Sequence, residues 1–289
     1  MGADPPAPRR GGRRLPSQRR ATRAARRNQG SELLARVLVA IPAIAFALFI
    51  VNRGGWIFTV ALIVLGVACL GELFTMLRHG HPVRLGGFLG LAGMLVAAQA
   101  GDAEDVLLAM AAAVPVIFLL GLTQPKMGAP GLSVTALGLV WIGLPLAHAV
   151  LLRELPHGDA IIIDVLVGTF VGDTGAYLGG RAFGRRPLAP RISPNKTVEG
   201  WLIGVAAGIA GVWFAGLYQD WLSGTQALLL GVAVALVAPL GDLFESYIKR
   251  DAGVKDSGRL FGAHGGALDR LDAVLFAAVA GYYVWSAMA

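Results

Sequence analysis

Nine apolar runs follow one another along this 289-residue chain, and they constrain its fold more than any other feature. A helix needs roughly 20 apolar residues to cross a bilayer. Charged residues make up only 15% of the sequence, against about 25% in a typical soluble domain. The sequence therefore predicts an all-α, polytopic integral membrane protein with about nine transmembrane helices. The runs lie at about 33–51, 55–71, 85–101, 106–122, 131–152, 160–180, 201–218, 223–243 and 268–288.

The lysines and arginines between these runs are distributed unequally. If the N-terminus is cytoplasmic, the cytoplasmic connections carry 13 of them and the outer connections carry only Arg53 and Arg153. Because basic residues favour the cytoplasmic side of a membrane, we expect a cytoplasmic N-terminus and cytoplasmic segments at 181–200 and 244–267. The expected location is a bacterial plasma membrane, although the Arg-rich start of the chain also fits an organellar transit peptide.

The first 31 residues differ in composition from the rest. Nine of the 25 basic residues are arginines within the first 30 positions, among Pro, Gly, Ala and Gln, which is typical of a disordered tail. These arginines either bind anionic lipid headgroups or form a solvated extension that the site does not need. The single cysteine, Cys69, lies in an apolar run, so the sequence offers no disulfide and no cysteine metal site.

Two polar segments interrupt the apolar pattern in the second half of the chain. One is SYIKRDAGVKDSGRLFGAHGGALDRLD, residues 246–272, between the last two apolar runs. The other extends from Thr169 to Gly200 and combines Asp173 with arginine, lysine, serine and threonine residues. Asp173 and Asp242 lie within or at the edge of apolar runs, where an ionisable group is energetically unfavourable and is more often functional than incidental.

Carboxylates beside basic and hydroxyl side chains suit a phosphorylated substrate with a divalent cation, because carboxylate and phosphate oxygens can share the metal. Alternatives remain open at this point. Asp269 and Asp272 lie three residues apart at a predicted helix start, where acidic side chains also interact favourably with the helix dipole. A transporter or ion pump would carry intramembrane aspartates too, although its polar residues are expected near the middle of the membrane rather than at one face.

Segment 246–272 resembles the signature of the phosphatidate cytidylyltransferases, also called CDP-diacylglycerol synthases. GDTGAY and SPNKTVEG upstream resemble further blocks of that family, so the similarity covers about residues 165–289. Gly262-Ala263 stands where the family usually has Pro-Gly, and Asp164 belongs to no family block and is expected to be structural. The matching positions of the signature are Ser246, Lys249, Arg250, Lys255, Asp256, Gly258, His264, Gly265, Gly266, Asp269, Arg270 and Asp272.

The resemblance implies a reaction of phospholipid biosynthesis in which CTP and phosphatidic acid give CDP-diacylglycerol and pyrophosphate. It implies Mg²⁺ held by Asp242 and Asp269, with Asp173 as a third ligand, and leaves open a second, monovalent cation. Expected partners are CTP, phosphatidic acid and membrane lipids, without nucleic acid, and a homodimer is left open. The expected catalytic residues are Lys249, Arg250, Lys255, Asp256, His264, Arg270 and Asp272. The expected phosphate-binding residues are Ser193, Lys196, Thr197, Ser246, Gly265 and Gly266.

These observations divide the chain into three parts. Residues 1–31 form the Arg-rich cytoplasmic tail, 32–160 the N-terminal transmembrane helices, and 161–289 a catalytic transmembrane region whose active site faces the cytoplasm.

Overall fold

The computed structural model describes residues 42, 44–258 and 265–289. The predicted tail (1–31), the Gly262-Ala263 pair and the predicted catalytic residue His264 lie outside the described residues. The chain divides into two compact units, Met1–Ala47 and Leu48–Ala289. All elements and sites described below belong to the second unit.

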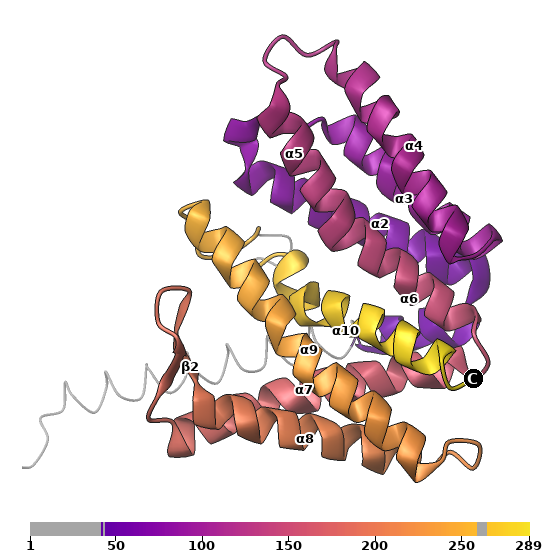
Figure 1. Cartoon of the computed structure of the whole chain (residues 1–289), viewed down its shortest axis with the longest axis vertical. Helices are drawn as coiled ribbons and strands as arrows, with labels where there is room; N and C mark the ends of the chain where they lie inside the picture. Colours follow the sequence, from indigo (N-terminus) through magenta and orange to yellow (C-terminus); the bar gives the residue numbers. More distant parts are fainter. Residues whose placement is uncertain (1–41, 43, 259–264) are drawn as a thin grey trace, which may run out of the picture. The chain divides into compact units, whose positions relative to one another are not determined.

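The second unit is built almost entirely from helices (Figure 1). Its α-helices are α2 (Gly55–Met76), α3 (Arg84–Ala100), α4 (Ala103–Gly121), α5 (Ala129–Gly138), α6 (Leu144–Glu154), α7 (Gly158–Phe183), α8 (Val198–Gly216), α9 (Gly224–Asp251) and α10 (Leu268–Ser286). A 3₁₀ turn at Arg78–Gly80 follows α2, and a π-helical segment at Leu139–Gly143 joins α5 to α6.

Six helical segments are long and apolar enough to cross a membrane, which supports the predicted helical membrane protein. The described residues do not show the nine spans that the sequence predicted. The helix Arg84–Ala100 has only 17 residues, and α10 has three charged residues in its first five positions, Asp269, Arg270 and Asp272. The six segments are Gly55–Met76, Ala103–Gly121, Ala129–Glu154, Gly158–Phe183, Val198–Gly216 and Gly224–Asp251.

A short β-hairpin between α7 and α8 is an addition to the predicted helical fold. Strand β1 (Pro187–Ala189) pairs antiparallel with β2 (Ser193–Thr197), with Pro187 opposite Thr197 and Ala189 opposite Ser193. The segment contains three prolines and lacks alternating apolar residues, so its sequence did not predict strands. Glu199 fixes the base of the hairpin, because its carboxylate accepts the backbone N–H groups of Arg185 and Arg186 at 3.0 and 3.1 Å.

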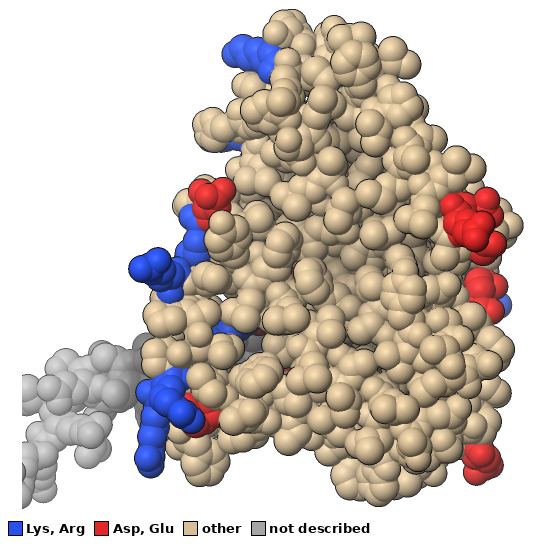
Figure 2. Space-filling view, viewed as in Figure 1, with Lys and Arg blue, Asp and Glu red and all other residues tan. Residues whose placement is uncertain are grey.

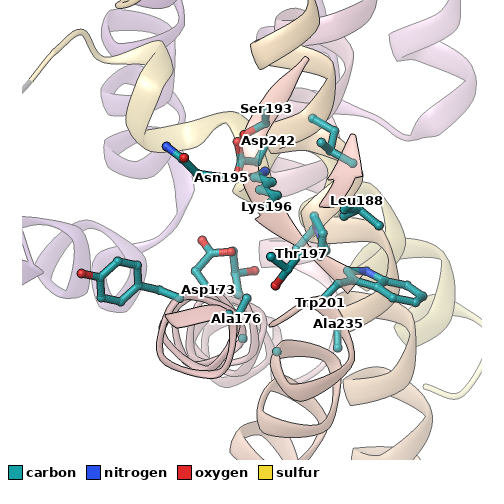
Figure 3. A pocket seen from close by; sticks show the side chains of 18 of the residues that line it. Asp173, Ala176, Leu188, Ser193, Asn195, Lys196, Thr197, Trp201, Ala235 and Asp242 are labelled. Atoms are coloured by element: carbon teal, nitrogen blue, oxygen red, sulfur yellow. Dashed lines mark ion pairs between the residues drawn. The ribbon is translucent and has the colours of Figure 1, made fainter. Parts of the chain in front are cut away.

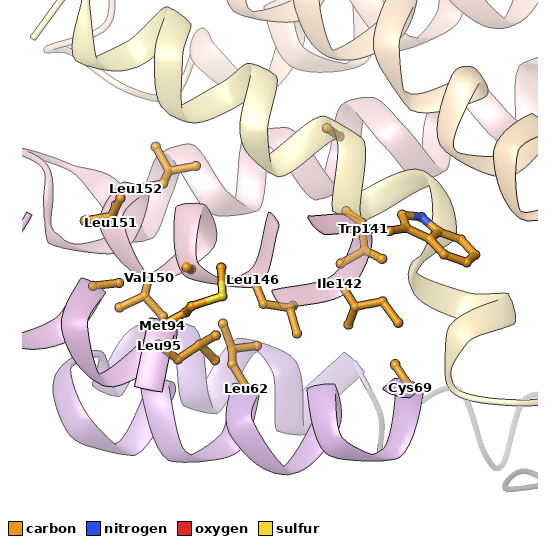
Figure 4. Packing of buried hydrophobic residues seen from close by; sticks show 14 of the residues in the cluster. Leu62, Cys69, Met94, Leu95, Trp141, Ile142, Leu146, Val150, Leu151 and Leu152 are labelled. Carbon is orange, nitrogen blue, oxygen red and sulfur yellow. The ribbon is translucent and has the colours of Figure 1, made fainter. Parts of the chain in front are cut away.

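Buried apolar side chains from α2 through α10 form the core of the unit, and Figure 4 shows part of it. Leu62 of α2, Met94 of α3 and Val150 of α6 meet there and are almost fully buried. Large apolar side chains such as Val64 and Leu108 are instead exposed on the outer helix faces. An apolar exterior is what a lipid environment permits, since outward-facing apolar side chains then remain in a hydrocarbon medium.

Small residues allow α7 and α8 to pack closely. A Cβ atom added to Gly204 of α8 would lie 2.7 Å from the Cβ of Ala176 and 2.8 Å from the carbonyl oxygen of Gly172, both on α7. Any larger residue would force the two helices apart. The close contact therefore sets Asp173, the residue after Gly172, beside the first turns of α8.

Charged side chains of the second unit gather at opposite ends of its helices. Figure 2 shows mainly basic side chains on the left edge, where Figure 1 places the hairpin and the end of α9, and mainly acidic ones on the right edge. Exposed residues of the first group are Arg181, Arg185, Arg186, Arg191 and Arg250, and those of the second are Asp102, Glu104, Asp105, Glu154 and Asp220.

Candidate active site

A cavity of about 610 Å³ lies among α7, the hairpin, α8 and α9 (Figure 3). Asn195 of the hairpin, Trp201 of α8 and Pro239 of α9 line it together with five residues that the sequence analysis selected. Those five come from three different elements, which the fold brings to one place. They are Asp173, Ser193, Lys196, Thr197 and Asp242.

An ion pair between Lys196 and Asp242 crosses the cavity from the hairpin to α9. The side chains of these residues are 27% and 32% exposed, so water and a ligand can reach both. The carboxylate of Asp173 is close enough to interact with the charges of both Asp242 and Lys196. Lys196 thus faces two carboxylates, and the exposed Arg181 adds a second cation to the lining of the cavity.

The N-terminus of α8 also borders the cavity. Thr197 is its N-cap residue, and the Thr197 hydroxyl accepts the backbone N–H of Gly200 at 3.1 Å. Helix N-termini carry partial positive charge and present N–H groups to anions. Together with Lys196, this end of α8 gives one wall of the cavity an attraction for phosphate.

A second polar cluster joins α9 to α10. The Lys249 ammonium donates to Glu245 at 2.6 Å and to Asp269 at 2.8 Å, and the Glu245 side chain is only 1% exposed. Asp272 is close enough to interact with both Asp242 and Glu245. The helices cross so closely that a Cβ atom on Gly241 would overlap the carbonyl oxygen of Asp272. The cluster therefore adjoins the cavity through Asp242.

Asp269 holds the start of α10 and the chain before it. Both of its carboxylate oxygens lie 3.1 Å from the backbone N–H of Ser257, and one accepts the N–H of Gly266 at 2.7 Å. Burial alone would raise the pKa of Asp269, but hydrogen bonds from Lys249 and Gly266 lower it to about 2. Asp269 is thus an anion at neutral pH, and its role as a metal ligand stays a prediction.

The other predicted residues that the structure describes do not line the cavity. The Ser246 hydroxyl donates to Asp242 at 3.5 Å, and the Arg250 Nε donates to the carbonyl of Ile192 at 3.2 Å, which ties α9 to the hairpin. Gly265 has φ 84°, a left-handed conformation that favours glycine. The remaining residues of this group, Lys255, Asp256 and Arg270, are exposed.

Two acidic residues of this region were missed in the sequence. Glu245 lies within the last turns of α9, where its fully buried carboxylate contacts Lys249. Glu72 belongs to α2, far away in the sequence, and accepts hydrogen bonds from Ser257, Ala267 and Leu268. The available signal for Glu72 was its position as the only charged residue of α2. Asp164, expected to be structural, is buried and held at both oxygens by Gln219 at 3.0 Å.

The cavity fits a divalent cation only in combination with a substrate. Across residues 44–258 and 265–289, no three His, Cys, Asp or Glu side chains are placed to hold a metal ion by themselves. Asp173 and Asp242 nevertheless offer two carboxylates in one accessible cavity. Mg²⁺ commonly binds through one or two carboxylates and completes its coordination with water and substrate phosphates. The donor set matches that pattern.

The cavity of this helical membrane protein combines carboxylates, a lysine and a helix N-terminus, which suits a membrane enzyme that acts on phosphate groups. Residues 34–288 match the sequence profile of the cytidylyltransferase family. The chain belongs to this family, as the resemblance in segment 246–272 predicted. The transporter alternative is thereby set aside.

Several relatives carry the name phosphatidate cytidylyltransferase. The chain is 34% identical to the Synechocystis protein over 283 residues, which cover 86% of this chain and 94% of the relative. It is 35% identical to the Brucella suis protein over 263 residues, with 89% and 94% coverage. A shorter match of 125 residues to the Helicobacter pylori protein reaches 49% identity and covers 42% and 46% of the two chains.

Mutations of Lys249 and of Lys196 are expected to change the stability of the protein by different amounts. Lys249→Met leaves the carboxylates of Glu245 and Asp269 largely buried without their cation, and should destabilise the protein by about 3 kcal/mol or more. Lys196→Met breaks a pair that is partly exposed, so it should change stability by at most about 1 kcal/mol. Thermal unfolding in detergent measures both. Equal shifts in Tm for the two variants would show that the α9–α10 cluster does not depend on Lys249.

Proposed function

We propose that the protein transfers the cytidylyl group of CTP to phosphatidic acid, giving CDP-diacylglycerol and pyrophosphate. Membership of the cytidylyltransferase family and 34% identity to a phosphatidate cytidylyltransferase over most of both chains support this activity. The structural observation that carries it is the accessible Lys196–Asp242 pair beside Asp173, in a cavity whose wall includes the N-terminus of α8.

In this reaction an oxygen of the lipid phosphate attacks the α-phosphorus of CTP. The new P–O bond forms as the bond to the β-phosphate breaks, and pyrophosphate leaves with that electron pair. A phosphomonoester is already ionised at neutral pH, so the reaction needs no general base. The main requirement is to hold two anionic reactants together, which demands positive charge.

The cavity and the cluster beside it can supply that charge. Lys196, Thr197 and Ser193 lie at the cavity, where they would bind phosphate oxygens. Lys249 and Arg250, on the last turn of α9, are assigned to the same task together with the exposed Lys255. As phosphate enters, Lys196 would exchange part of its contact with Asp242 for the substrate.

Mg²⁺ is the proposed cofactor, with Asp242 and Asp173 as the residues that would hold it. Asp269 is the third proposed ligand, although it would have to exchange its hydrogen bond with Lys249. When bound, the metal ion neutralises phosphate charge and polarises the phosphorus centre.

The charge distribution supports a location for the active site. The end of the unit with the hairpin and the last turn of α9 is basic, and the opposite end is acidic. Basic segments favour the cytoplasmic side. We therefore place the active site at the cytoplasmic face of a bacterial plasma membrane, where a water-borne nucleotide can meet a lipid headgroup.

The activity is tested by incorporation of radiolabelled CTP into chloroform-soluble product in detergent micelles, with and without phosphatidic acid. The wild-type protein should incorporate label only when phosphatidic acid is present. Asp242→Asn keeps the shape of the side chain but removes its charge, so turnover should fall at least about a thousandfold.

Asp164→Asn is the matched control, since it also neutralises an aspartate in a long apolar helix. The Asp164 side chain is hydrogen-bonded to Gln219 and does not line the cavity. It should affect folding yield rather than turnover. Absence of product with the wild-type protein would overturn the proposed activity. An Asp242→Asn protein that is folded and keeps more than a tenth of wild-type turnover would overturn the role of Asp242.

The orientation is tested by labelling single cysteines in a Cys69→Ser background. Asp251→Cys and Glu104→Cys both place a thiol at an exposed position, at the basic and the acidic end respectively. In intact cells a membrane-impermeant thiol reagent should label only the cysteine at position 104. Labelling at 251 but not at 104 would reverse the proposed topology.

A further inference from the structure

Glu72 connects the N-terminal helices to the start of α10. One of its carboxylate oxygens accepts the backbone N–H of Ala267 at 2.9 Å. The other accepts the N–H of Leu268 at 3.0 Å and the hydroxyl of Ser257 at 2.8 Å. The N-cap residue of α10, Ala267, makes no side-chain hydrogen bond to the helix, so Glu72 supplies the anion that the first N–H groups require.

Ser257 connects Glu72 to Asp269 through further hydrogen bonds. Its backbone N–H lies 3.1 Å from both Asp269 oxygens, and its hydroxyl accepts the Asp269 backbone N–H at 3.4 Å. Asp269 in turn accepts from Lys249 at 2.8 Å. A continuous series of hydrogen bonds therefore runs from Glu72 through Ser257 to the charged cluster beside the cavity.

The approach of Glu72 also explains two glycines of segment 246–272. A Cβ atom on Gly258 or on Gly266 would overlap the carboxylate of Glu72, and at Gly266 it would overlap the Ser257 hydroxyl as well. Both glycines have ordinary negative backbone φ angles, so conformational freedom is not the reason for them. Glycine is needed there because the carboxylate occupies the space that a side chain would take.

We propose that Glu72 is a positioning residue for the reaction. It holds Ser257 and the first turn of α10 so that Asp269 and Asp272 keep their places beside Lys249 and Asp242. Glu72 does not line the cavity and makes no contact of its own with the substrate site. The inference rests on the proposed cytidylyl transfer, and it assigns a function in that reaction to a helix of the N-terminal half.

Glu72→Gln tests the link between Glu72 and α10, because glutamine has nearly the same shape as glutamate. A carboxylate can accept from all three donors, whereas a glutamine amide has one accepting oxygen and one NH₂ group. In either orientation the NH₂ group would face the backbone N–H of Ala267 or of Leu268, and neither of these can accept a hydrogen bond. The amide therefore cannot reproduce the cap, and the start of α10 should shift.

The expected result for Glu72→Gln is a fall in kcat of about 100-fold, because small displacements of reacting groups have effects of that size. The KM for CTP should stay within about threefold, since Asp173, Lys196 and Thr197 are on elements that Glu72 does not touch. Glu72→Asp keeps both oxygens on a shorter side chain and should recover part of the lost kcat. The readouts are kcat and KM for CTP in micelles, and Tm in the same detergent.

Asp164→Asn again serves as the matched control, because it neutralises a carboxylate that only Gln219 contacts through hydrogen bonds in the described structure. The inference is overturned if Glu72→Gln keeps its kcat, or if it lowers kcat only in proportion to a loss of Tm, as a purely structural residue would. A wild-type protein without phosphatidic-acid-dependent product would instead overturn the proposed function, so the two failures are distinguishable.

Ser257→Ala keeps the test decisive if Glu72→Gln does not fold. It leaves the carboxylate and both N–H donors of α10 in place and removes only the hydroxyl between Glu72 and Asp269. The hydrogen bond to the Glu72 carboxylate is lost together with the longer one from the Asp269 N–H, so kcat should fall about tenfold with little change in Tm. An unchanged kcat for folded Ser257→Ala would overturn the inference.

Discussion

The site depends on the compensation of carboxylate charge at the ends of apolar helices. Asp173, Asp242, Glu245, Asp269 and Asp272 lie on three helices and interact with one another. Like charges so close together, partly removed from water, are unfavourable unless cations accompany them. Lys196 and Lys249 provide part of that compensation, one in the cavity and one in the cluster beside it. Under the proposed function, a bound metal ion and the phosphates of the substrate would complete the compensation in the cavity.

The packing of the helices determines the distances between these charged groups. Glycines bring α7 against α8 and α9 against α10, so Asp173 lies beside the start of α8 and Asp272 approaches Asp242. The hairpin then carries Lys196 to the cavity, and the hydrogen bond from Arg250 to Ile192 ties it to α9. The N-terminal half contributes as well, because α2 caps α10 through Glu72. The catalytic region is thus supported by helices that carry none of its signature residues.

Much of this could be predicted from the sequence. Apolar runs of nearly membrane-spanning length predicted the helices, and the spacing of charged residues in segment 246–272 predicted the family. The hairpin could not be predicted, since β1 and β2 lack alternating apolar residues and are held by Glu199 from a neighbouring helix. The contact of Glu72 with α10 could not be predicted either, because 195 residues separate Glu72 from Ala267. The division of the predicted residues between cavity and adjoining cluster depends on how α9 and α10 cross, which one sequence does not specify.

The most direct test of this account is a structure of the protein with a non-reactive CTP analogue and Mn²⁺, in which anomalous scattering locates the metal. The account predicts an anomalous peak at Asp242 and Asp173 inside the cavity. It also predicts that the triphosphate lies against Lys196 and the N-terminus of α8. A triphosphate bound outside the cavity, or a metal peak remote from both aspartates, would contradict it.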